Sequence, residues 1–362
     1  MGRILTRDDV EAAVRGGSIF AAGGGGWADH GRMLGAAAVA AGRPELVSMT
    51  EVPDEAWIAT AAAIGAPAGT TTWEMRGDDY VRAVELLEEA LGEPLYGLMI
   101  GQNGRSSTLN AWLPAARRGL KVIDAVGDMR AHPTGDMGSI GMAGSPEPTI
   151  QTAAGGHRAS NAYLELVVRG ATAKVSPILR TASDMSGGFI ASCRNPLRAS
   201  YVRKHAALGG ISRAIALGEA ILAAEGSGGE AVIDAICSIT GGAILGSGRV
   251  VDKAVAYTAE AFDIGVISLR CEGGDFKLHV MNEYMAVDRG DGSRAATFPD
   301  VITTLDARGE PVSVGQVEVG MDLHLFHIPK AHIPLSASVR DPSVYPVVEA
   351  ALGISISPFA LA

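Results

Sequence analysis

Cysteine and aromatic residues are scarce in this chain of 362 residues. The three cysteines, Cys193, Cys237 and Cys271, lie far apart and are odd in number, which argues against a disulfide framework and favours a reducing compartment. Aromatic residues make up only 5% of the chain, so its cores must be mainly aliphatic. The N-terminal segment lacks the apolar core of a signal peptide, and no apolar stretch reaches the ~18 residues of a membrane span. We therefore expect a cytoplasmic protein that does not enter a membrane.

Basic residues are fewer than acidic ones, 30 against 40, so the formal net charge is −10. This balance argues against a nucleic-acid partner and against an anionic membrane surface. It leaves open a small anionic substrate, since local fields decide that. The length predicts about two domains at ~150 residues each. The 47 glycines follow no period, which indicates many tight turns.

Several common motifs are missing. The four glycines at residues 23–26 do not form Gly-x-Gly-x-x-Gly, and no Gly-Lys-Ser/Thr follows them, so neither a dinucleotide site nor a P-loop is supported. No Gly-x-Ser-x-Gly elbow occurs, which disfavours a Ser-His-Asp hydrolase. An Asp-x-Gly-Gly-Thr phosphate loop is absent as well. We expect no nucleotide cofactor.

The glycine run at residues 23–26 is the most informative feature that is present. A strand is predicted over residues 19–22 before it, and a helix over residues 30–41 after it. Without side chains, the backbone N–H groups of Gly24, Gly25 and Gly26 can approach a ligand closely, and the helix start adds positive partial charge. This geometry suits an anion or a polarised carbonyl. The alternative is a tight turn with no ligand.

Strands and helices alternate through the first half of the chain. An amphipathic helix is predicted over residues 78–91, with apolar strands at 95–100 and 120–126. The alternation predicts an α/β domain over residues 1–168, a mostly parallel sheet with helices on both faces. Residues 169–362 are predicted to form a β-rich α+β domain that contains a helical segment.

Local signals add further elements to this arrangement. Thr6 is predicted to cap a first helix that Gly16 and Gly17 end. Residues 172–179 have the pattern of a strand, and residues 197–224 that of a helical tract broken near Gly209.

Polar residues follow two of the predicted strands directly. Asn103 comes after the strand at 95–100, and the strand at 120–126 carries Asp124. Parallel sheets bind their ligands beyond the carboxyl ends of the strands, so Asn103 is predicted to bind substrate and Asp124 to take part in catalysis.

The segment after the second of these strands holds Asp128, Arg130 and His132. Asp128 and His132 are catalytic candidates as a base and its orienting partner, or alternatively two ligands of a divalent metal such as zinc or manganese. Arg130 can hold a substrate carboxylate. The structural alternative is that Asp124 caps a turn and pairs with Arg130.

A second polar cluster lies in the β-rich half. Glu283 stands inside an apolar stretch, where an unpaired carboxylate is costly to bury, so it faces a polar cavity or has a partner. Glu283 and Asp300 are predicted to be catalytic and Asn282 to bind substrate, with a structural role as the alternative.

Three histidines near the C-terminus are close enough in the sequence to suggest a metal site, but their spacing disfavours one. Residues three apart on a strand point to opposite faces, and prolines interrupt the region. His30, at the start of the helix after the glycine run, is a better candidate for the cleft. The disfavoured triad is His324, His327 and His332.

Taken in order along the chain, these motifs resemble the family of S-methyl thiohydantoin desulfurase-like proteins, over about residues 8–350. The resemblance implies a two-domain α/β protein of bacteria that is often a homo-oligomer and is encoded beside hydantoinase- and oxoprolinase-type genes. The activity that it implies is removal of sulfur from a thiohydantoin ring. The motifs are the glycine run, Asn103, residues 122–124, residues 128–133, residues 241–250, Asn282 with Glu283, and residues 298–302.

Desulfuration of such a ring fits the candidate residues. Water attacks the electrophilic carbon between the two ring nitrogens, which requires a general base or a metal-activated water. We expect Asp128 or His132 to activate water, the glycine run to hold the ring carbonyl, and Glu283 or Asp300 to complete a site between the domains. Two alternatives stay open: hydrolysis of a related cyclic amide C–N bond, and a noncatalytic ligand-binding subunit of a hydantoinase-type partner.

Overall fold

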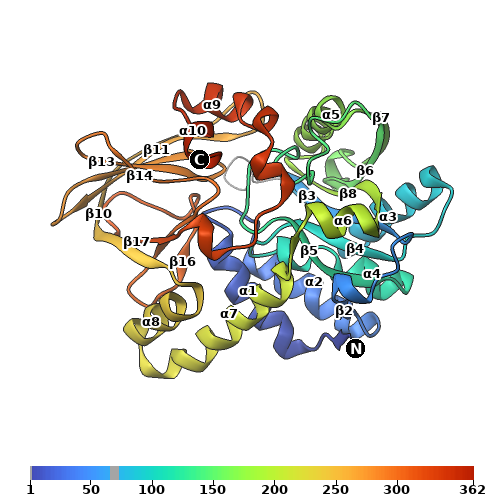
Figure 1. The fold of residues 1–362 in the computed structure, drawn as a ribbon, viewed down its shortest axis with the longest axis horizontal. Helices are drawn as coiled ribbons and strands as arrows, with labels where there is room; N and C mark the ends of the chain where they lie inside the picture. Colours follow the sequence, from blue (N-terminus) through green and yellow to red (C-terminus); the bar gives the residue numbers. More distant parts are fainter. Residues whose placement is uncertain (1, 66–72) are drawn as a thin grey trace.

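A computed structural model describes residues 2–65 and 73–362. Its strands form two sheets, called sheet A and sheet B, which lie side by side (Figure 1). Sheet A has nine strands in the order β1-β2-β5-β4-β3-β8-β6-β7, with β9 paired to β5. Sheet B has eight strands in the order β14-β13-β12-β11-β10-β17-β15-β16.

Sheet A is parallel at its centre and antiparallel at its flanks. The parallel strands are β2 (Glu45–Val47), β5 (Lys121–Asp128), β4 (Gly97–Gln102) and β3 (Trp57–Gly65). The remaining strands pair antiparallel: β1 (Arg3–Ile4), β8 (Phe189–Arg198), β6 (Thr149–Gly155), β7 (Leu164–Gly170) and β9 (Ala207–Leu208).

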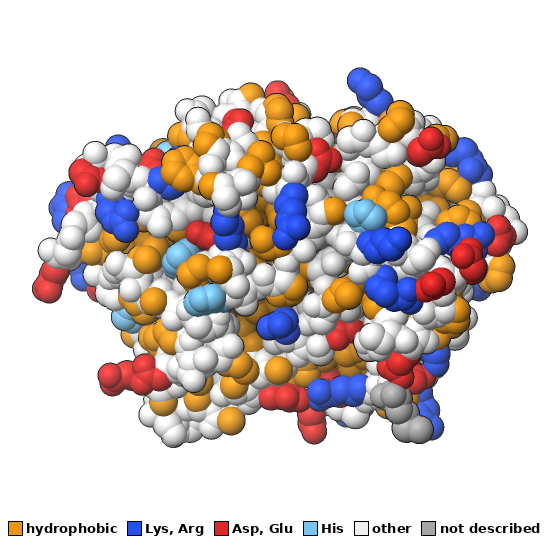
Figure 2. Space-filling model, viewed as in Figure 1, with side chains coloured by type: hydrophobic (Ala, Val, Ile, Leu, Met, Phe, Trp, Pro, Cys, Tyr) orange, Lys and Arg blue, Asp and Glu red, His pale blue; other side chains and the backbone are white. Residues whose placement is uncertain are grey.

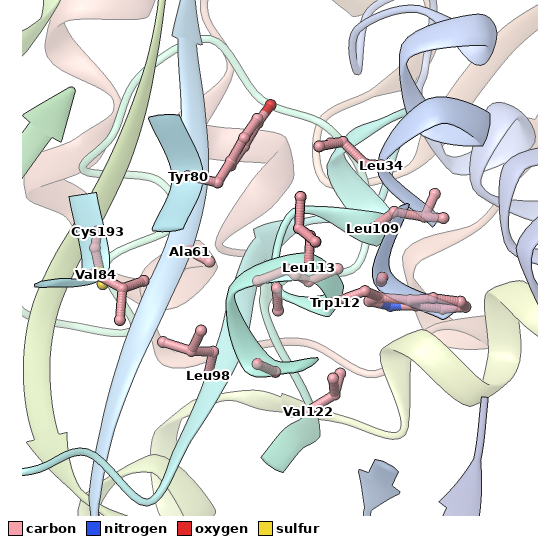
Figure 3. Packing of buried hydrophobic residues seen from close by; sticks show 14 of the residues in the cluster. Leu34, Ala61, Tyr80, Val84, Leu98, Leu109, Trp112, Leu113, Val122 and Cys193 are labelled. Carbon is pink, nitrogen blue, oxygen red and sulfur yellow. The ribbon is translucent and has the colours of Figure 1, made fainter. Parts of the chain in front are cut away.

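Helices cover both faces of sheet A. Neighbouring residues of its strands point to opposite sides, so both faces carry apolar side chains that need to be covered. Leu98 and Val122 pack into the main core with Trp112 and Leu113, as Figure 3 shows, whereas Met99 packs into a second cluster on the other face. The predicted α/β class is therefore confirmed. The helices are α1 (Arg7–Phe20), α2 (Ala28–Ala41), α3 (Gly77–Leu91), α4 (Trp112–Arg118), α5 (Thr172–Met185), α6 (Ala199–His205) and α7 (Gly210–Ala224).

Sheet B is antiparallel at every described pairing, in agreement with the predicted β-rich second domain. Its strands are β10 (Ala243–Tyr257), β11 (Asp263–Cys271), β12 (Phe276–Met281), β13 (Glu283–Arg289), β14 (Arg294–Thr297), β15 (Val301–Leu305), β16 (Pro311–Val312) and β17 (Asp322–Ile328). The helices α8 (Gly229–Thr240), α9 (Pro346–Leu352) and α10 (Ser357–Ala360) accompany it.

The two sheets do not divide at residue 168. Strand β8 lies beyond that point in the sequence, yet it pairs with β3 and β6 inside sheet A. Helix α7 also belongs to this half, because it packs along α1. The first strand of sheet B begins at Ala243. The predicted domain boundary between residues 168 and 169 stays a prediction.

The predicted strand at residues 19–22 is wrong. Helix α1 begins with the predicted cap at Thr6 but continues through Gly16 and Gly17 to Phe20. These glycines let other segments approach the helix: a Cβ on Gly16 would fall 1.8 Å from the carbonyl oxygen of Ala214 in α7. Gly16 and Gly17 therefore serve helix packing, and the glycine run joins two helices instead of a strand and a helix.

The predicted strand at residues 172–179 is wrong too, because this segment is the first part of α5. Its buried residues include Val175, Leu179 and Ala182, a helical spacing that a window of eight residues does not reveal. The helix at 78–91 and the strands at 95–100 and 120–126 are confirmed to within a few residues. The break in the tract 197–224 is confirmed as well.

The glycine run lies where the two sheets meet. The N–H of Tyr284 in β13 donates to the carbonyl of Ala22 at 2.8 Å, and the N–H of Val314 donates to that of Gly23 at 2.9 Å. On the other side, the N–H of Ser106, after β4, donates to the carbonyl of Gly25 at 3.0 Å. The turn is thus held by both sheets.

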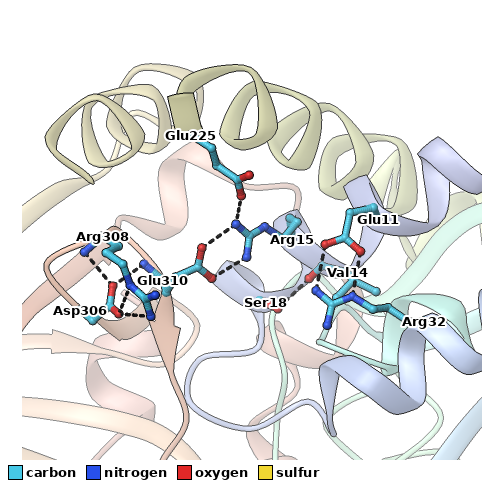
Figure 4. Close-up of polar contacts among 9 residues, drawn as sticks. All are labelled: Glu11, Val14, Arg15, Ser18, Arg32, Glu225, Asp306, Arg308 and Glu310. Atoms are coloured by element: carbon cyan, nitrogen blue, oxygen red, sulfur yellow. Dashed lines mark hydrogen bonds and ion pairs between the residues drawn. The ribbon is translucent and has the colours of Figure 1, made fainter. Parts of the chain in front are cut away.

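Ion pairs reinforce this junction at the surface (Figure 4). Arg15 of α1 pairs with Glu225 at the end of α7 and with Glu310 beside β16 at 2.5 Å. On the face seen in Figure 2, acidic and basic side chains are intermixed. None of the helices in the described ranges is both long and apolar enough to cross a bilayer.

Candidate active site

A small polar cavity lies at the junction of the sheets. Its volume is about 60 Å³. Most of its lining comes from sheet A and the loops around it, and Asn282 and Glu283 reach it from sheet B. The lining comprises Gly25, Gly26, residues 62–65, Gly101, Gln102, Ser107, Asn110, residues 132–135, Ser176, Arg180, Phe189, Arg194, Asn282 and Glu283.

Only part of the glycine run faces this cavity. Gly25 and Gly26 line it, and their φ angles of +72° and +82° favour glycine. Gly24 lies beside the cavity: its N–H donates to the carbonyl of Ala21, and its Cα faces the carboxyl group of Glu283. Gly26 is also packed so closely that a Cβ there would fall 2.0 Å from Oγ of Ser106.

Glu283 is the predicted catalytic residue with the most unusual surroundings. It follows Asn282, whose left-handed backbone (φ +57°) turns the chain into β13 while its side-chain oxygen accepts the N–H of Asp263 at 2.9 Å. The Glu283 side chain is buried, and its Oε2 has no hydrogen-bond partner among the described residues. Burial raises its pKa to about 8, although the charges of Arg130 and Arg180 act in the opposite direction.

His132 lines the same cavity. Its backbone N–H donates to Oε1 of Gln102 at 3.0 Å, and its Nε2 lies 3.4 Å from the carbonyl oxygen of Gly101. A proton on Nε2 can be donated to this carbonyl, and the buried Nδ1 has no hydrogen-bond partner of good geometry among the described residues. Burial lowers the pKa of His132 to about 3, so the imidazole is neutral at ordinary pH.

Two arginines of the cavity were missed by the sequence analysis. Arg180 comes from α5 and Arg194 from β8, and both segments were assigned otherwise or not at all. The available signal was an arginine next to the apolar run at residues 189–193, where an unpaired charge is unfavourable.

Asp128 and Arg130 lie outside the cavity lining. The Asp128 carboxyl group is fully buried, neither oxygen has a hydrogen-bond partner within the described ranges, and burial raises its pKa to about 7. Arg130 is also fully buried: its Nη1 donates to the carbonyl of Asp300 at 2.9 Å, and its guanidinium lies 5.3 Å from the ring centre of Phe298. Arg130 is thus occupied by the protein itself.

Three other predicted site residues have structural contacts away from the cavity. Asp124 accepts the N–H groups of Ile211 and Ser212 at 3.0 and 3.1 Å, which caps α7. Asn103 donates to the carbonyls of Met129 and Gly210 at 3.2 and 3.1 Å. Asp300 accepts the N–H of Lys330 at 2.7 Å and contacts Nε2 of His327 at 2.9 Å.

The residues present do not fit the predicted metal site. Within residues 2–65 and 73–362, no group of three or more His, Cys, Asp or Glu side chains is placed to ligate a metal ion. His132 lines the cavity whereas Asp128 does not. His30 bonds to the Tyr80 hydroxyl at 3.1 Å instead of facing the cavity, and His324 and His332 contact Ser247 and the Gly241 carbonyl.

Fold and site together define a two-domain α/β protein with a small polar cavity where its sheets meet, a location that suits a small molecule. The S-Me-THD-like N-terminal domain matches residues 8–161 and the S-Me-THD-like C-terminal domain matches residues 171–336, so the chain belongs to the S-methyl thiohydantoin desulfurase-like family. The resemblance inferred from the motifs is thereby confirmed. The two matches leave residues 162–170 between them.

The same fold occurs in a crystal structure of a protein from Chromobacterium violaceum. The TM-score is 0.72 at 21% sequence identity, and the match covers 97% of this chain and 96% of that one. This likeness supports the fold alone. No curated protein matches the chain.

Proposed function

We propose that the protein is a hydrolase that removes sulfur from a small thiohydantoin-like ring, with Glu283 as its general base and acid. The observation that carries this proposal is the buried Glu283 carboxyl group, with a pKa of about 8 and an oxygen without a partner among described residues, in one cavity with His132 and the glycine run. A carboxyl group with such a pKa can take a proton from water and return it near neutral pH. Membership of the S-Me-THD-like family supports the ring class.

The proposed reaction begins at the ring carbon that carries the sulfur between two nitrogens. Glu283, as the carboxylate, takes a proton from a water molecule while the water oxygen bonds to this carbon. The carbon–sulfur bond then breaks, and Glu283 returns the proton to the leaving thiolate. The second water proton ends on the ring nitrogen, so an S-substituted thiohydantoin and water give a hydantoin and a thiol.

Neighbouring groups support this reaction. The neutral His132 imidazole, with Nδ1 as an acceptor, can orient the attacking water or a ring N–H. Phe189 gives the cavity an apolar wall against which a flat ring can lie. The volume of about 60 Å³ corresponds to about two water molecules, so side chains must move apart to admit a substituted ring.

The proposal is tested with purified protein and a panel of hydantoins and S-substituted thiohydantoins. Thiol release and ring opening are followed separately, in the wild type and in Glu283→Gln. Thiol release without ring opening, lost in Glu283→Gln, supports desulfuration. Ring opening without thiol release would instead favour the cyclic amide C–N hydrolase.

A third outcome addresses the noncatalytic alternative. If no ring reacts unless a hydantoinase-type protein is added, and the two proteins co-purify in a fixed ratio, the chain is a binding subunit and the proposal fails. The homo-oligomer and this partner stay predictions. No step of the proposed reaction is routed through a metal, because the described side chains do not provide a site for one.

A further inference from the structure

We propose that the cavity holds a carboxylate group of its ligand between Arg180 and Arg194, so that the substrate is an acidic ring compound. The ring is taken from the proposed function, whereas the argument for the anion site depends only on Arg180 and Arg194. This assignment replaces Arg130, the arginine that the sequence suggested for the same task, because Arg130 is bonded to the protein and does not line the cavity.

Arg194 is a buried cation without a close ion-pair partner among the described residues, although the charge of Asp136 acts on it. It stands in β8 opposite Thr60 of β3, and 8% of its surface is exposed. No described residue forms a hydrogen bond or an ion pair with its guanidinium, and its Nε is fully enclosed. Its Nη atoms lie against Gly101 and Gly135, which have no side chains to cover them and which both line the cavity.

Arg180 presents a second guanidinium to the cavity. Its Nη2 donates to the carbonyl of Pro133 at 2.8 Å, and its guanidinium lies 4.5 Å from the ring centre of Phe262. Its buried Nη1 has no partner among the described residues. The charge of Arg194 contributes to lowering the pKa of Arg180, so the two cations repel each other across this space.

Two acidic groups nearby offset part of this positive charge. Glu283 lies near Arg180 and Asp136 near Arg194, as their mutual electrostatic effects indicate. Burial raises the pKa of both carboxyl groups, that of Glu283 to about 8, which keeps Glu283 largely protonated at neutral pH. The charge of Asp263 also raises the pKa of Arg180, but more weakly than that of Glu283 does.

Three arginines elsewhere in the protein form ion pairs with carboxylates, in contrast to Arg194. One surface hollow, of about 1020 Å³, is lined by four arginines, of which Arg105 donates to Oε1 of Gln316 and to the carbonyl of Pro311. Figure 4 shows the other three, Arg15, Arg32 and Arg308, each bonded to a carboxylate. Their charges are compensated without a ligand. Arg194 is more deeply buried than these three and has no such partner within the described ranges.

A carboxylate fits this position in charge and shape. Burying a cation without a partner is costly, and charge-assisted hydrogen bonds from two guanidinium groups to one carboxylate remove that cost. The small cavity favours a planar carboxylate over a bulkier phosphate. Glu283, protonated, remains beside the ring to which such a carboxylate is attached.

The test compares an acid with its neutral amide. Binding of hydantoin-5-acetate and of hydantoin-5-acetamide is measured by calorimetry, with inorganic phosphate as a competitor. We expect the wild type to bind the acid at least about tenfold more tightly, a difference typical of one charge-assisted contact. Arg194→Gln should abolish this preference, Arg194→Lys should keep part of it, and the surface control Arg308→Gln should keep all of it.

Three results would overturn the inference: equal affinity of the wild type for acid and amide, an unchanged preference in Arg194→Gln, or phosphate that displaces the acid at equal concentration. Circular dichroism checks that Arg194→Gln is folded; if it is not, Arg180→Gln and the wild-type comparison decide. If the acid is preferred but no ring reacts, the anion site stands and the proposed function fails. If acidic and neutral rings react equally well, the function stands and the anion site fails.

Discussion

Glu283 and Gly24 are so close that a Cβ on Gly24 would fall 2.2 Å from Oε1 of Glu283. The two residues come from opposite halves of the chain, one from the turn between α1 and α2 and the other from the start of β13. The absence of a side chain at position 24 therefore makes room for the carboxyl group on which the proposed chemistry depends.

Gly24→Ala should displace the Glu283 carboxyl group and abolish most turnover. Gly24 does not have a positive φ, so the effect comes from this contact and not from backbone strain. Overpacking of this kind costs about 1–3 kcal/mol of stability. Turnover of the thiohydantoin panel and the urea midpoint are the measurements.

Gly226→Ala is the matched control for this variant, because nothing lies within 4 Å of a Cβ at that position. It should change neither quantity. Wild-type turnover in Gly24→Ala would show that the placement of Glu283 by the glycine run does not matter for activity.

Glu283→Gln should lower turnover by about 10²–10⁴-fold, the usual contribution of a general acid–base group. In the wild type, turnover should rise with pH to a plateau above about 8, because only the carboxylate accepts a proton from water. A pH–rate profile of both proteins measures this. A wild-type profile that is flat between pH 6 and 9 would contradict the role of Glu283.

Glu283 should also make stability depend on pH. Its pKa is raised in the folded protein from an ordinary 4.5 to about 8, so the folded state binds the proton more tightly than the unfolded state. The resulting stabilisation is complete below pH 4.5 and is lost as the pH rises through 8. The wild type should therefore lose stability relative to Glu283→Gln over this range, by a few kcal/mol at order of magnitude, as measured by urea unfolding at several pH values.

Asp128→Asn should keep most of the turnover, because the Asp128 carboxyl group does not line the cavity. This variant is a buried-carboxyl control for Glu283→Gln. Steady-state kinetics on the same substrates decides between them. A loss as large as that in Glu283→Gln would restore Asp128 to the catalytic position suggested by its place after β5.

Gly16→Ala should destabilise the protein by about 3 kcal/mol or more, since the new methyl group would meet the backbone of α7, which cannot move away cheaply. Gly218 makes the reciprocal contact, with a Cβ 1.8 Å from the carbonyl oxygen of Ala12. Urea unfolding with Gly226→Ala as the reference measures the effect. Equal midpoints for the two variants would mean that α1 and α7 are not so tightly packed.

Part of the site followed from the sequence for reasons of local chemistry. Glu283 stood out because a carboxylate in an apolar stretch needs a cavity or a partner, and the glycine run stood out because it has no side chains. Both line or border the cavity, together with His132 and Asn282. Asp124 and Asn103 were also reasonable candidates at strand ends, but a capping contact and a loop contact use the same polar groups.

Other parts of the site depended on pairings between distant segments. Arg180 lies on α5, where a strand was predicted from a short window, and Arg194 lies on β8, which joins sheet A from the other side of residue 168. Arg194 follows an apolar run, but this pattern does not separate a ligand-binding cation from one paired inside the protein, and Arg180 has no such pattern. Neither guanidinium has an ion-pair partner among the described residues, and this is visible only after every neighbouring carboxylate has been placed.

The sequence by itself determined the alternation of strands and helices, the aliphatic cores and the family, because these depend on residue type and spacing along one segment. Only the tertiary structure decided that α1 runs through Gly16 to Phe20, and that Arg130 is bonded to Asp300 while Arg194 has no hydrogen bond to a described residue. The physical reason is that burial and charge compensation are properties of neighbours in space. A residue far along the chain can fill the space beside a glycine or provide the partner of a guanidinium. The local sequence does not show whether such a residue is present.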